Sequence, residues 1–271
     1  MPSLYVVGTP IGNLEDISSR ALRILREVSL IASEDTRTTR HLLTHFDIHT
    51  PLTSYFEHSK TAKVDYLLQT LKTGDVALVS EAGMPGISDP GYDLIVAAQN
   101  AGIPVIPIPG PSAAVTALAV SGLPTDRFHY LGFLPRRGSE RRKRLTEAAK
   151  ETATLVAYEA PHRLNDALCD IITVLGNRRL AVCRELTKLH EEVFRGTAEE
   201  ARDYFSAPRG EFTLVIAGAE PEAIVMSGAE VSTRIKELKE EGLSAKEVAA
   251  ELSKESGLSR KELYELWLKT N

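Results

Sequence analysis

Apolar runs of strand length alternate with amphipathic segments over the first 125 residues of the chain. In SSRALRILREV, for example, Ala21, Leu22, Leu25 and Val28 recur at helical spacing. This alternation is typical of βαβ units and predicts a mostly parallel sheet in an α/β domain. Strands are expected at 4–8, 30–33, 76–80 and 105–108, and helices through 40–43, 66–71 and 94–98.

After GLPTD (122–126), a segment typical of a linker, strand-like runs outnumber helical ones. Fewer helices per strand predict a second α/β domain with a mixed sheet, and a ligand site is expected in the cleft between the two domains. A capping box formed by Thr197 and Glu200 marks the start of one helix. Strands are expected at 154–159, 180–185, 191–196 and 212–218, with a further helix through 164–172.

From about Gly228 the pattern is helical and has no strand-like run. Capping boxes at 244–247 and 259–262, each preceded by a glycine that can end the previous helix, predict three short helices with a small core. Such a module is either a nucleic-acid-binding tri-helical unit or a packing appendage, and the spacing does not choose between them. The expected domains are 1–121, 122–227 and 228–271.

Composition adds the general class of protein. Of the 271 residues, 43% are hydrophobic and 25% are charged, which is ordinary for a globular protein. Cys169 and Cys183 fit neither a metal site nor a disulfide framework and are expected to be core residues of a reduced protein. The N-terminal segment lacks the features of a signal peptide, and no apolar run reaches the ~20 residues of a membrane span. A cytoplasmic protein with no membrane partner is expected.

The net charge of −5 argues against a surface coated in positive charge for nucleic acid. One segment of the chain is nevertheless strongly basic. RRGSERRKR (136–144) carries six basic residues and one acidic residue. Most charge runs are solvated surface, so composition alone predicts a loop followed by a first helical turn here.

Three unusual loops follow predicted strands of the first region: GTPIGN (8–13), SEAGMPGISDPG (80–91) and PGPS (109–112). Ligands of parallel sheets lie beyond the carboxyl ends of the strands, and glycine lets the main chain approach a ligand closely. The loops therefore predict one ligand enclosed by main chain. Neither GTPIGN nor SEAGMPGISDPG has the glycine spacing of a P-loop or of a dinucleotide-binding turn, so the sequence disfavours an ATPase and a dehydrogenase.

Charged residues also follow the strands. Glu34, Asp35 and Arg37 come directly after the second strand and form either a helix cap with a surface ion pair or a substrate-facing cluster. Glu159 and Glu185 lie at strand ends of the second region and could likewise be capping or structural partners, or substrate-facing groups. His41, His45 and His49 are spaced like metal ligands, but Pro51 is expected to end the helix before the third, so no metal site is predicted.

Five motifs together resemble the tetrapyrrole methylase superfamily, the class III methyltransferases, and most closely its ribosomal RNA small-subunit methyltransferase I branch. They are GTPIGNLEDIS, ASEDTRTTRHLL, SEAGMPGISDPG, PGPSAAVTAL and GFLPR. The resemblance runs through the whole chain. It implies S-adenosylmethionine bound in a folded conformation between two α/β domains. It also implies 2'-O-methylation of a decoding-centre cytidine ribose in 16S rRNA of the small ribosomal subunit, by a homodimer.

The same resemblance implies the residues of a cofactor site, with the glycine loops holding the cofactor and residues of the second domain closing over it. Members that methylate corrinoids carry an aspartate in the first loop and another in the second, where this chain has Asn13 and Met84. These departures favour the RNA branch. The implied cofactor contacts are Pro10, Gly83, Met84, Ile87, Ser88, Ser112, Ala113, Phe133, Ala160 and Ala217.

Methyl transfer to a ribose hydroxyl needs a group that accepts the proton, and we assign this role to Glu34 or Asp35, with Arg37 holding phosphate or orienting the carboxylate. An RNA substrate also changes the interpretation of the basic segment, which is then expected to contact phosphates. The alternatives are a tetrapyrrole methyltransferase and a non-catalytic RNA-binding assembly protein. The expected RNA contacts are Arg136, Arg137, Arg141, Arg142, Lys143 and Arg144.

Overall fold

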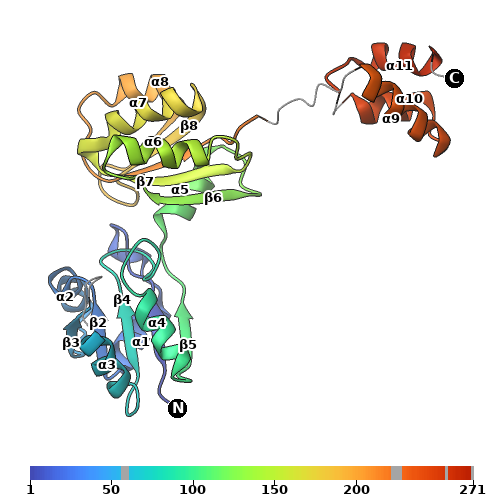
Figure 1. The fold of residues 1–271 in the computed structure, drawn as a ribbon. Helices are drawn as coiled ribbons and strands as arrows, with labels where there is room; N and C mark the ends of the chain where they lie inside the picture. The colour runs from blue at the N-terminus through green and yellow to red at the C-terminus, as the bar shows by residue number, and fades with distance from the viewer. Residues whose placement is uncertain (56–60, 221–227, 254–255, 270–271) are drawn as a thin grey trace. The chain divides into compact units, whose positions relative to one another are not determined.

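A computed structural model describes residues 1–55, 61–220, 228–253 and 256–269 and shows two five-stranded sheets followed by a group of helices (Figure 1). Both sheets lie in one compact unit, residues 1–219, and the helices lie in a second unit, residues 220–271. No helix in the described ranges is both long enough and apolar enough to cross a bilayer.

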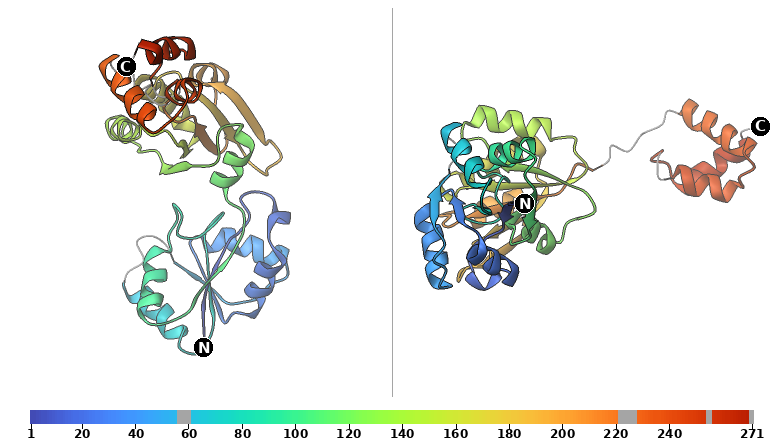
Figure 2. Two further views of the ribbon diagram at one scale, coloured as in Figure 1. Left: turned by 90° about the vertical axis from the view of Figure 1, so that its right-hand side faces the viewer. Right: turned by 90° about the horizontal axis from the view of Figure 1, so that it is seen from below.

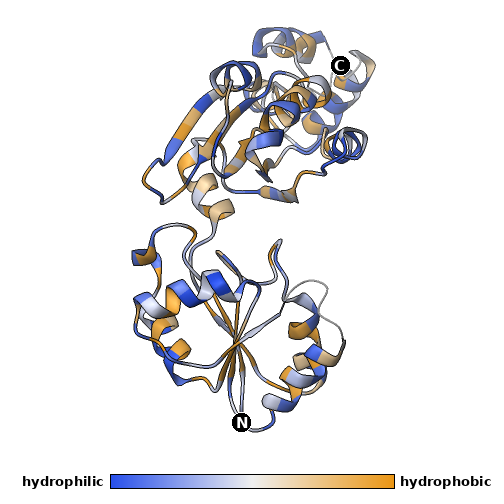
Figure 3. Cartoon of the chain, turned by 90° about the vertical axis from the view of Figure 1, so that its left-hand side faces the viewer, coloured by the Kyte–Doolittle hydropathy of each residue, from blue (hydrophilic) through white to orange (hydrophobic). Residues whose placement is uncertain are grey.

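The first sheet has the strand order β3-β2-β4-β1-β5, and all of its strand pairs are parallel. Its helices cover both faces, and in Figure 3 the apolar strands lie between helices that carry hydrophilic stretches. The expected strands and helices are confirmed, and the short edge strand β3 was not predicted. The elements are β1 (Leu4–Val7), α1 (Ser19–Glu27), β2 (Leu30–Ser33), α2 (Thr36–His45), β3 (Leu52–Ser54), α3 (Thr61–Thr70), β4 (Val76–Val79), α4 (Tyr92–Asn100) and β5 (Val105–Ile108), with a 3-10 turn at Leu14–Asp16.

The chain leaves the two central strands, β1 and β4, toward opposite faces of this sheet. Buried residues of α1 and α2 form one core cluster with the sheet, and those of α3 and α4 form another (Figure 2, left). Because β1 leads to α1 and β4 leads to α4, the loops after these neighbouring strands diverge. Such a switch point at the carboxyl ends of parallel strands is where open α/β sheets bind ligands.

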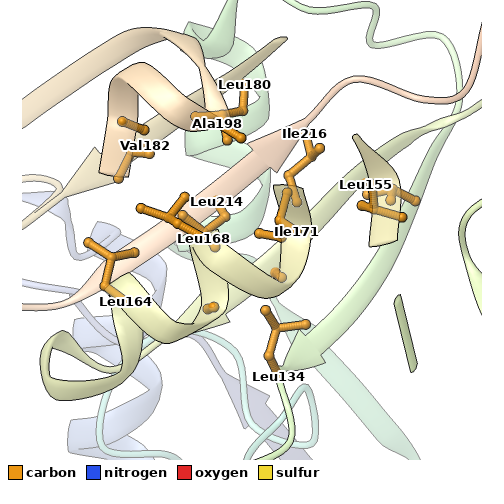
Figure 4. Packing of buried hydrophobic residues seen from close by; sticks show 14 of the residues in the cluster. Leu134, Leu155, Leu164, Leu168, Ile171, Leu180, Val182, Ala198, Leu214 and Ile216 are labelled. Carbon is orange, nitrogen blue, oxygen red and sulfur yellow. The ribbon is translucent and has the colours of Figure 1, made fainter. Parts of the chain in front are cut away.

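The second sheet has the order β6-β7-β10-β8-β9, in which only the β6–β7 pair is parallel. This confirms the expected mixed sheet. Its main core lies beneath α7, where Leu164, Leu168 and Ile171 pack with Leu134 (Figure 4). The elements are α5 (Ala113–Ser121), β6 (Phe128–Phe133), α6 (Gly138–Glu147), β7 (Thr154–Glu159), α7 (Leu164–Leu175), β8 (Arg179–Arg184), β9 (Glu192–Thr197), α8 (Ala198–Tyr204) and β10 (Phe212–Ile216), with a 3-10 turn at Pro161–Arg163.

Helix α5 follows the first sheet in sequence but packs on the second. Its buried residues Ala114, Ala117 and Leu118 share a cluster with Val156 and Val215 of the second sheet. The helix is apolar on nearly all sides; one face is buried against the second sheet, and Val115 and Val120 on its other side are exposed. The domain boundary expected at residue 121 stays a prediction, and the structure shows the helix before it in the core of the second sheet.

Two local predictions can be compared with the helices. The basic segment was expected to be a loop and the first turn of a helix, and Arg136 and Arg137 do precede α6, but the rest of the segment extends into the helix beyond its first turn. Helix α2 ends at His45, so His49 lies outside it as predicted, and the His49 ring pairs with Asp47 at 3.0 Å.

The second unit contains the three helices that the sequence predicts, α9 (Gly228–Glu240), α10 (Ala245–Leu252) and α11 (Arg260–Lys269). Both capping boxes form, and Gly242 and Gly257 adopt positive φ at the ends of the preceding segments. The helices bury a core that includes Val231, Ile235 and Leu263.

Candidate functional site

The loops after β1, β4 and β5 pack directly against one another. Thr9 and Gly83 exchange two main-chain hydrogen bonds of 2.9 and 3.0 Å, and the Gly8 N–H donates to the Ile108 carbonyl at 3.1 Å. A Cβ atom on Gly8 would lie 2.7 Å from both Gly110 Cα and Met84 Sδ. This spacing is shorter than real contacts allow, so glycine is required where the loops meet. The three loops converge on one place, as the sequence predicts.

The loop 80–91 bends repeatedly through left-handed main-chain conformations. Gly83, Gly86 and Gly91 have positive φ, and so does Ser88 at +61°, where a non-glycine residue is uncommon. Ile87 and Ser88 are exposed at the top of the loop, whereas Pro10 and Gly83 are buried below them. The loop thus presents two predicted cofactor contacts to solvent, while a third, Gly83, is buried where the loop meets the turn after β1.

A chain of hydroxyl groups connects this loop to the second sheet. Ser88 Oγ lies 2.7 Å from the Tyr130 hydroxyl, and the Ala114 N–H donates to the Tyr158 hydroxyl at 3.1 Å. Tyr130 and Tyr158 are hydrogen-bonded to each other, and their ring centroids are 5.4 Å apart. Burial, and then the neighbouring Tyr130, raise the pKa of Tyr158. The chain holds the glycine loop, the second sheet and the start of α5 in one arrangement.

A second connection involves the loop 185–191. The Asn13 N–H donates to Thr187 Oγ1 at 3.0 Å, so this loop touches the turn after β1. Thr187 and Glu185 both have positive φ, and Glu185 accepts hydrogen bonds from Lys188 at 3.0 Å and from the Glu211 N–H at 2.8 Å. Glu185 therefore has a structural role in shaping this loop.

The predicted cofactor contacts of the second sheet do not all lie together. Phe133 lies beside Tyr158, with ring centroids 5.3 Å apart, and Ala160 directly follows the end of β7. Ala217 follows β10, whose Ile216 pairs with Leu155 at the other end of β7. At about 3.3 Å per residue, Ala217 lies roughly 15–20 Å along the sheet from Ala160. The contact between Gly132 and Ser88 lies opposite Ala157, about midway along β7 between the positions of Ala160 and Ala217.

The acidic cluster after β2 separates into residues with different environments. Asp35 caps α2, with Oδ1 accepting the Arg37 N–H at 2.7 Å and Oδ2 lying 3.0 Å from Arg37 Nη2. These hydrogen bonds lower the pKa of Asp35. Glu34 is half-buried, and its N–H donates to the Val79 carbonyl at 3.4 Å, so it lies at the end of β4 beside the glycine loop.

Asp89 joins Glu34 at this place, although the sequence did not single it out. Burial, and then the charge of Glu34, raise the pKa of Asp89 to about 6, while a hydrogen bond with Ser80 opposes the shift. Its charge also raises the pKa of Tyr130 and Tyr158 by smaller amounts. Sequence reasoning missed three candidate groups here: Asp89, which belongs to the loop 80–91, and Tyr130 and Tyr158, whose hydroxyl groups connect this loop to the second sheet. The one signal for Asp89 was its position within SDPG.

The basic segment is not uniformly exposed. Arg141 is buried, and its Nε donates to Asp170 Oδ2 at 2.7 Å, while Arg142, half-exposed, donates to the other oxygen at 3.0 Å. This pair attaches α6 to α7. The other four basic residues expose their side chains. They are Arg136, Arg137, Lys143 and Arg144.

One cavity lies away from these loops. It has a volume of about 630 Å³ and is lined by residues that precede strands, among them Met1, Pro2, Ile103 and Pro104. This is the amino-terminal end of the first sheet, opposite the converging loops. Since ligands of parallel sheets bind at the carboxyl ends, the loops are the better candidate site.

Family models and solved structures identify the fold. Residues 3–202 match the family Tetrapyrrole (Corrin/Porphyrin) Methylases, and residues 230–261 match the C-terminal HTH domain of a family of unknown function, DUF1699. The methyltransferase CobJ superposes with a TM-score of 0.61 at 18% identity, covering 81% of this chain and 95% of CobJ. Diphthine synthase superposes with a TM-score of 0.62 at 16% identity, covering 79% and 89%.

Relatives with much higher identity share one name, Ribosomal RNA small subunit methyltransferase I. The protein of Halalkalibacterium halodurans is 47% identical over 98% of this chain and 94% of its own length. That of Synechocystis is 48% identical over 99% and 98%. The chain therefore belongs to the tetrapyrrole methylase family and, within it, to the group of ribosomal RNA small subunit methyltransferase I proteins.

Proposed function

We propose that this chain transfers the methyl group of S-adenosylmethionine to the 2'-oxygen of a cytidine ribose in 16S rRNA of the small ribosomal subunit. The observation that carries the proposal is near-50% identity, over almost the whole chain, to proteins named for methylation of this RNA. The convergence of three main-chain loops at the switch point of the first sheet supports it, because it supplies one place for a ligand.

The residues at this place fit S-adenosylmethionine. When bound, the cofactor supplies a methyl group made electrophilic by its sulfonium. The glycines leave the main chain open to hydrogen bonds, and Met84 and Ile87 offer apolar contact. We assign the binding to the loops through Pro10, Gly83, Met84, Ile87, Ser88, Ser112 and Ala113, with Phe133, Ala160 and Ala217 from the second sheet.

Glu34 is the preferred proton acceptor. Asp35 and Arg37 are engaged with each other at the start of α2, whereas Glu34 lies at the end of β4 beside the glycine loop. A ribose hydroxyl held near Glu34 would pass its proton to the carboxylate as the methyl group is transferred. Holding the hydroxyl in line with the methyl group can contribute up to ~7–11 kcal/mol. Arg37, 88% exposed, remains available to a phosphate.

The exposed arginines and lysine of the basic segment would hold the RNA backbone. Arg141 and Arg142 share Asp170, so their contribution is to fix α6. We therefore expect phosphate contacts chiefly from Arg136, Arg137, Lys143 and Arg144. By resemblance we also propose that the enzyme acts as a homodimer in the cytoplasm and that the helical unit adds a second RNA contact.

Labelled S-adenosylmethionine incubated with small ribosomal subunits tests the proposal. Label is expected in 16S rRNA, and mass mapping should place it on one cytidine ribose. Corrinoid precursors, offered in a parallel reaction, should remain unlabelled. Label in the corrinoid, or cofactor binding without transfer to RNA, would overturn the assignment. A chain that fails to bind S-adenosylmethionine at millimolar concentration would instead be a non-catalytic RNA-binding protein.

A further inference from the structure

Strand β6 contains an irregularity that changes the direction of Phe133. Tyr130 pairs with Val156, but Gly132 pairs with the next residue, Ala157, so Leu131 is an extra residue. Without it, Phe133 would be opposite Glu159, which points to the other side of the sheet. With the bulge, Phe133 is opposite Tyr158. A shift of one residue moves a side chain to the other face, and bulges near active sites commonly act in this way.

The bulge lies against the loop that carries the predicted cofactor contacts. Gly132 has a φ of +69°, and a Cβ atom there would lie 3.3 Å from Ser88 Oγ. The ring of Phe133 is 55% exposed, and Ile87, next to Ser88, is 54% exposed. Two large apolar side chains thus reach solvent on neighbouring segments, beside the place where we propose methyl transfer.

The chain around Phe133 is firmly anchored. Leu134 is buried in the main core (Figure 4), and its carbonyl accepts a hydrogen bond from Arg163 Nη1 at 3.1 Å. Arg163 in turn forms a buried ion pair of 2.6 Å with Glu159. The exposure of Phe133 is therefore a fixed feature of the segment and is not caused by a loose strand end.

Positive charge follows immediately. Arg136 and Arg137 are exposed and lie three and four residues after Phe133, at the start of α6. An exposed aromatic ring beside arginines is the combination by which proteins hold an unstacked nucleotide, with the base on the ring and the phosphates on the charges. A ribose that reacts at its 2'-oxygen must reach the cofactor, which favours a nucleotide turned out of its stack.

We infer that Phe133 is the stacking platform for the base of the nucleotide that is methylated, with Arg136 and Arg137 contacting the flanking phosphates. The inference rests on the proposed function and adds to it the group that recognises the target base. It gives Phe133 a role toward the substrate, beyond its expected position at the border of the cofactor.

Small subunits reconstituted with 16S rRNA that carries either the natural cytidine or an abasic ribose at the methylated position provide the test. The abasic nucleotide keeps the 2'-hydroxyl but has no base to stack. Methyl transfer and S-adenosylmethionine affinity are measured for Phe133→Ala and Phe133→Trp. Phe128→Ala is the matched control, since Phe128 lies at the start of the same strand and is 45% exposed.

On the natural substrate, Phe133→Ala should lower kcat/KM roughly 5- to 150-fold, the range of one lost base stack, and the cofactor Kd, to which Phe133 also contributes, should rise by a much smaller factor. Phe133→Trp and Phe128→Ala should retain activity. On the abasic substrate, the wild type and Phe133→Ala should be equally slow.

An equal penalty for Phe133→Ala on both substrates, or a matching loss of cofactor affinity, would overturn the inference and leave Phe133 as a cofactor contact. A wild-type chain that methylates neither substrate would contradict the proposed function itself, which is a separate outcome.

Discussion

The two sheets of this chain use different parts of the polypeptide where they border the candidate site. In the first sheet the contacts at the strand ends are between main-chain groups, as in the Thr9–Gly83 pair, and side chains are excluded by close packing. In the second sheet the contacts come from the aromatic side chains of Tyr130, Phe133 and Tyr158. The difference fits our proposal that the main chain of the first sheet's loops holds the cofactor, while the ring of Phe133 in the second sheet holds the target base.

The largest expected effect tests the one side chain that we assign to chemistry at the first sheet. Glu34→Gln removes the proton acceptor while keeping its size, and single-turnover methylation should fall about 100- to 10,000-fold. Asp35→Asn should cost far less, because asparagine also caps helices well. Full activity in both variants would refute the assignment, and a loss confined to Asp35→Asn would transfer it to Asp35.

The main-chain contacts can be broken at Gly8. In Gly8→Ala the new methyl group would lie 2.7 Å from Gly110 Cα, and overpacking of this kind costs about 1–3 kcal/mol. We expect a lower melting temperature and weaker binding of S-adenosylmethionine in calorimetry. Gly228→Ala is the control, because no atom of the described residues lies within 4 Å of a Cβ atom there. Unchanged cofactor affinity in Gly8→Ala would contradict the main-chain role.

The side-chain contacts of the second sheet can be weakened at Tyr130. Tyr130→Phe removes the hydroxyl that lies 2.7 Å from Ser88 Oγ, and one such hydrogen bond is worth about 1 kcal/mol. The KM for the cofactor should rise by a few fold while kcat stays near the wild-type value. Tyr66→Phe, an exposed tyrosine of α3, should change neither constant. A fall in kcat alone would indicate that Tyr130 takes part in the chemistry instead.

The smallest expected effect is on the stability of the fold, which the buried, ionised carboxylate of Asp89 lowers at neutral pH. Its pKa of about 6 is above the ordinary value of 3.8, so the fold favours the protonated carboxyl and is destabilised as the pH rises through 6. Asp89→Asn should raise the melting temperature at about pH 8 and have less effect below about pH 4, where aspartic acid is protonated in both states. An equal gain at both pH values would show that the charge is not the cause.

Much of the first sheet could be predicted from the sequence, because its strands are short buried runs bounded by glycine and proline. LIAS and VIPI form strands with the bounds expected, and the three loops after β1, β4 and β5 converge as their glycines predicted. In both cases the signal is local. Apolar length identifies a buried strand, and a missing Cβ atom identifies a close approach of main chain.

In the second sheet, features that depend on residues distant in the sequence could not be predicted. The direction of Phe133 depends on one extra residue relative to the neighbouring strand, and a register between strands cannot be read from either strand alone. The burial of Arg141 depends on Asp170, which lies in another helix. The proximity of Asp89 to Glu34 likewise depends on two loops meeting in space, so neither residue type nor spacing indicates it.

The position of α5 has a practical consequence for anyone who divides the chain into fragments. A fragment that stops at residue 121 would carry a helix of alanine, valine and leucine with its partners left behind, and a remainder beginning at 122 would leave Val156 and Val215 uncovered. Exposed apolar faces of this kind promote aggregation. A cut within the PGPS turn, at 109–112, would keep the helix with its partners and give each piece a better prospect of staying in solution.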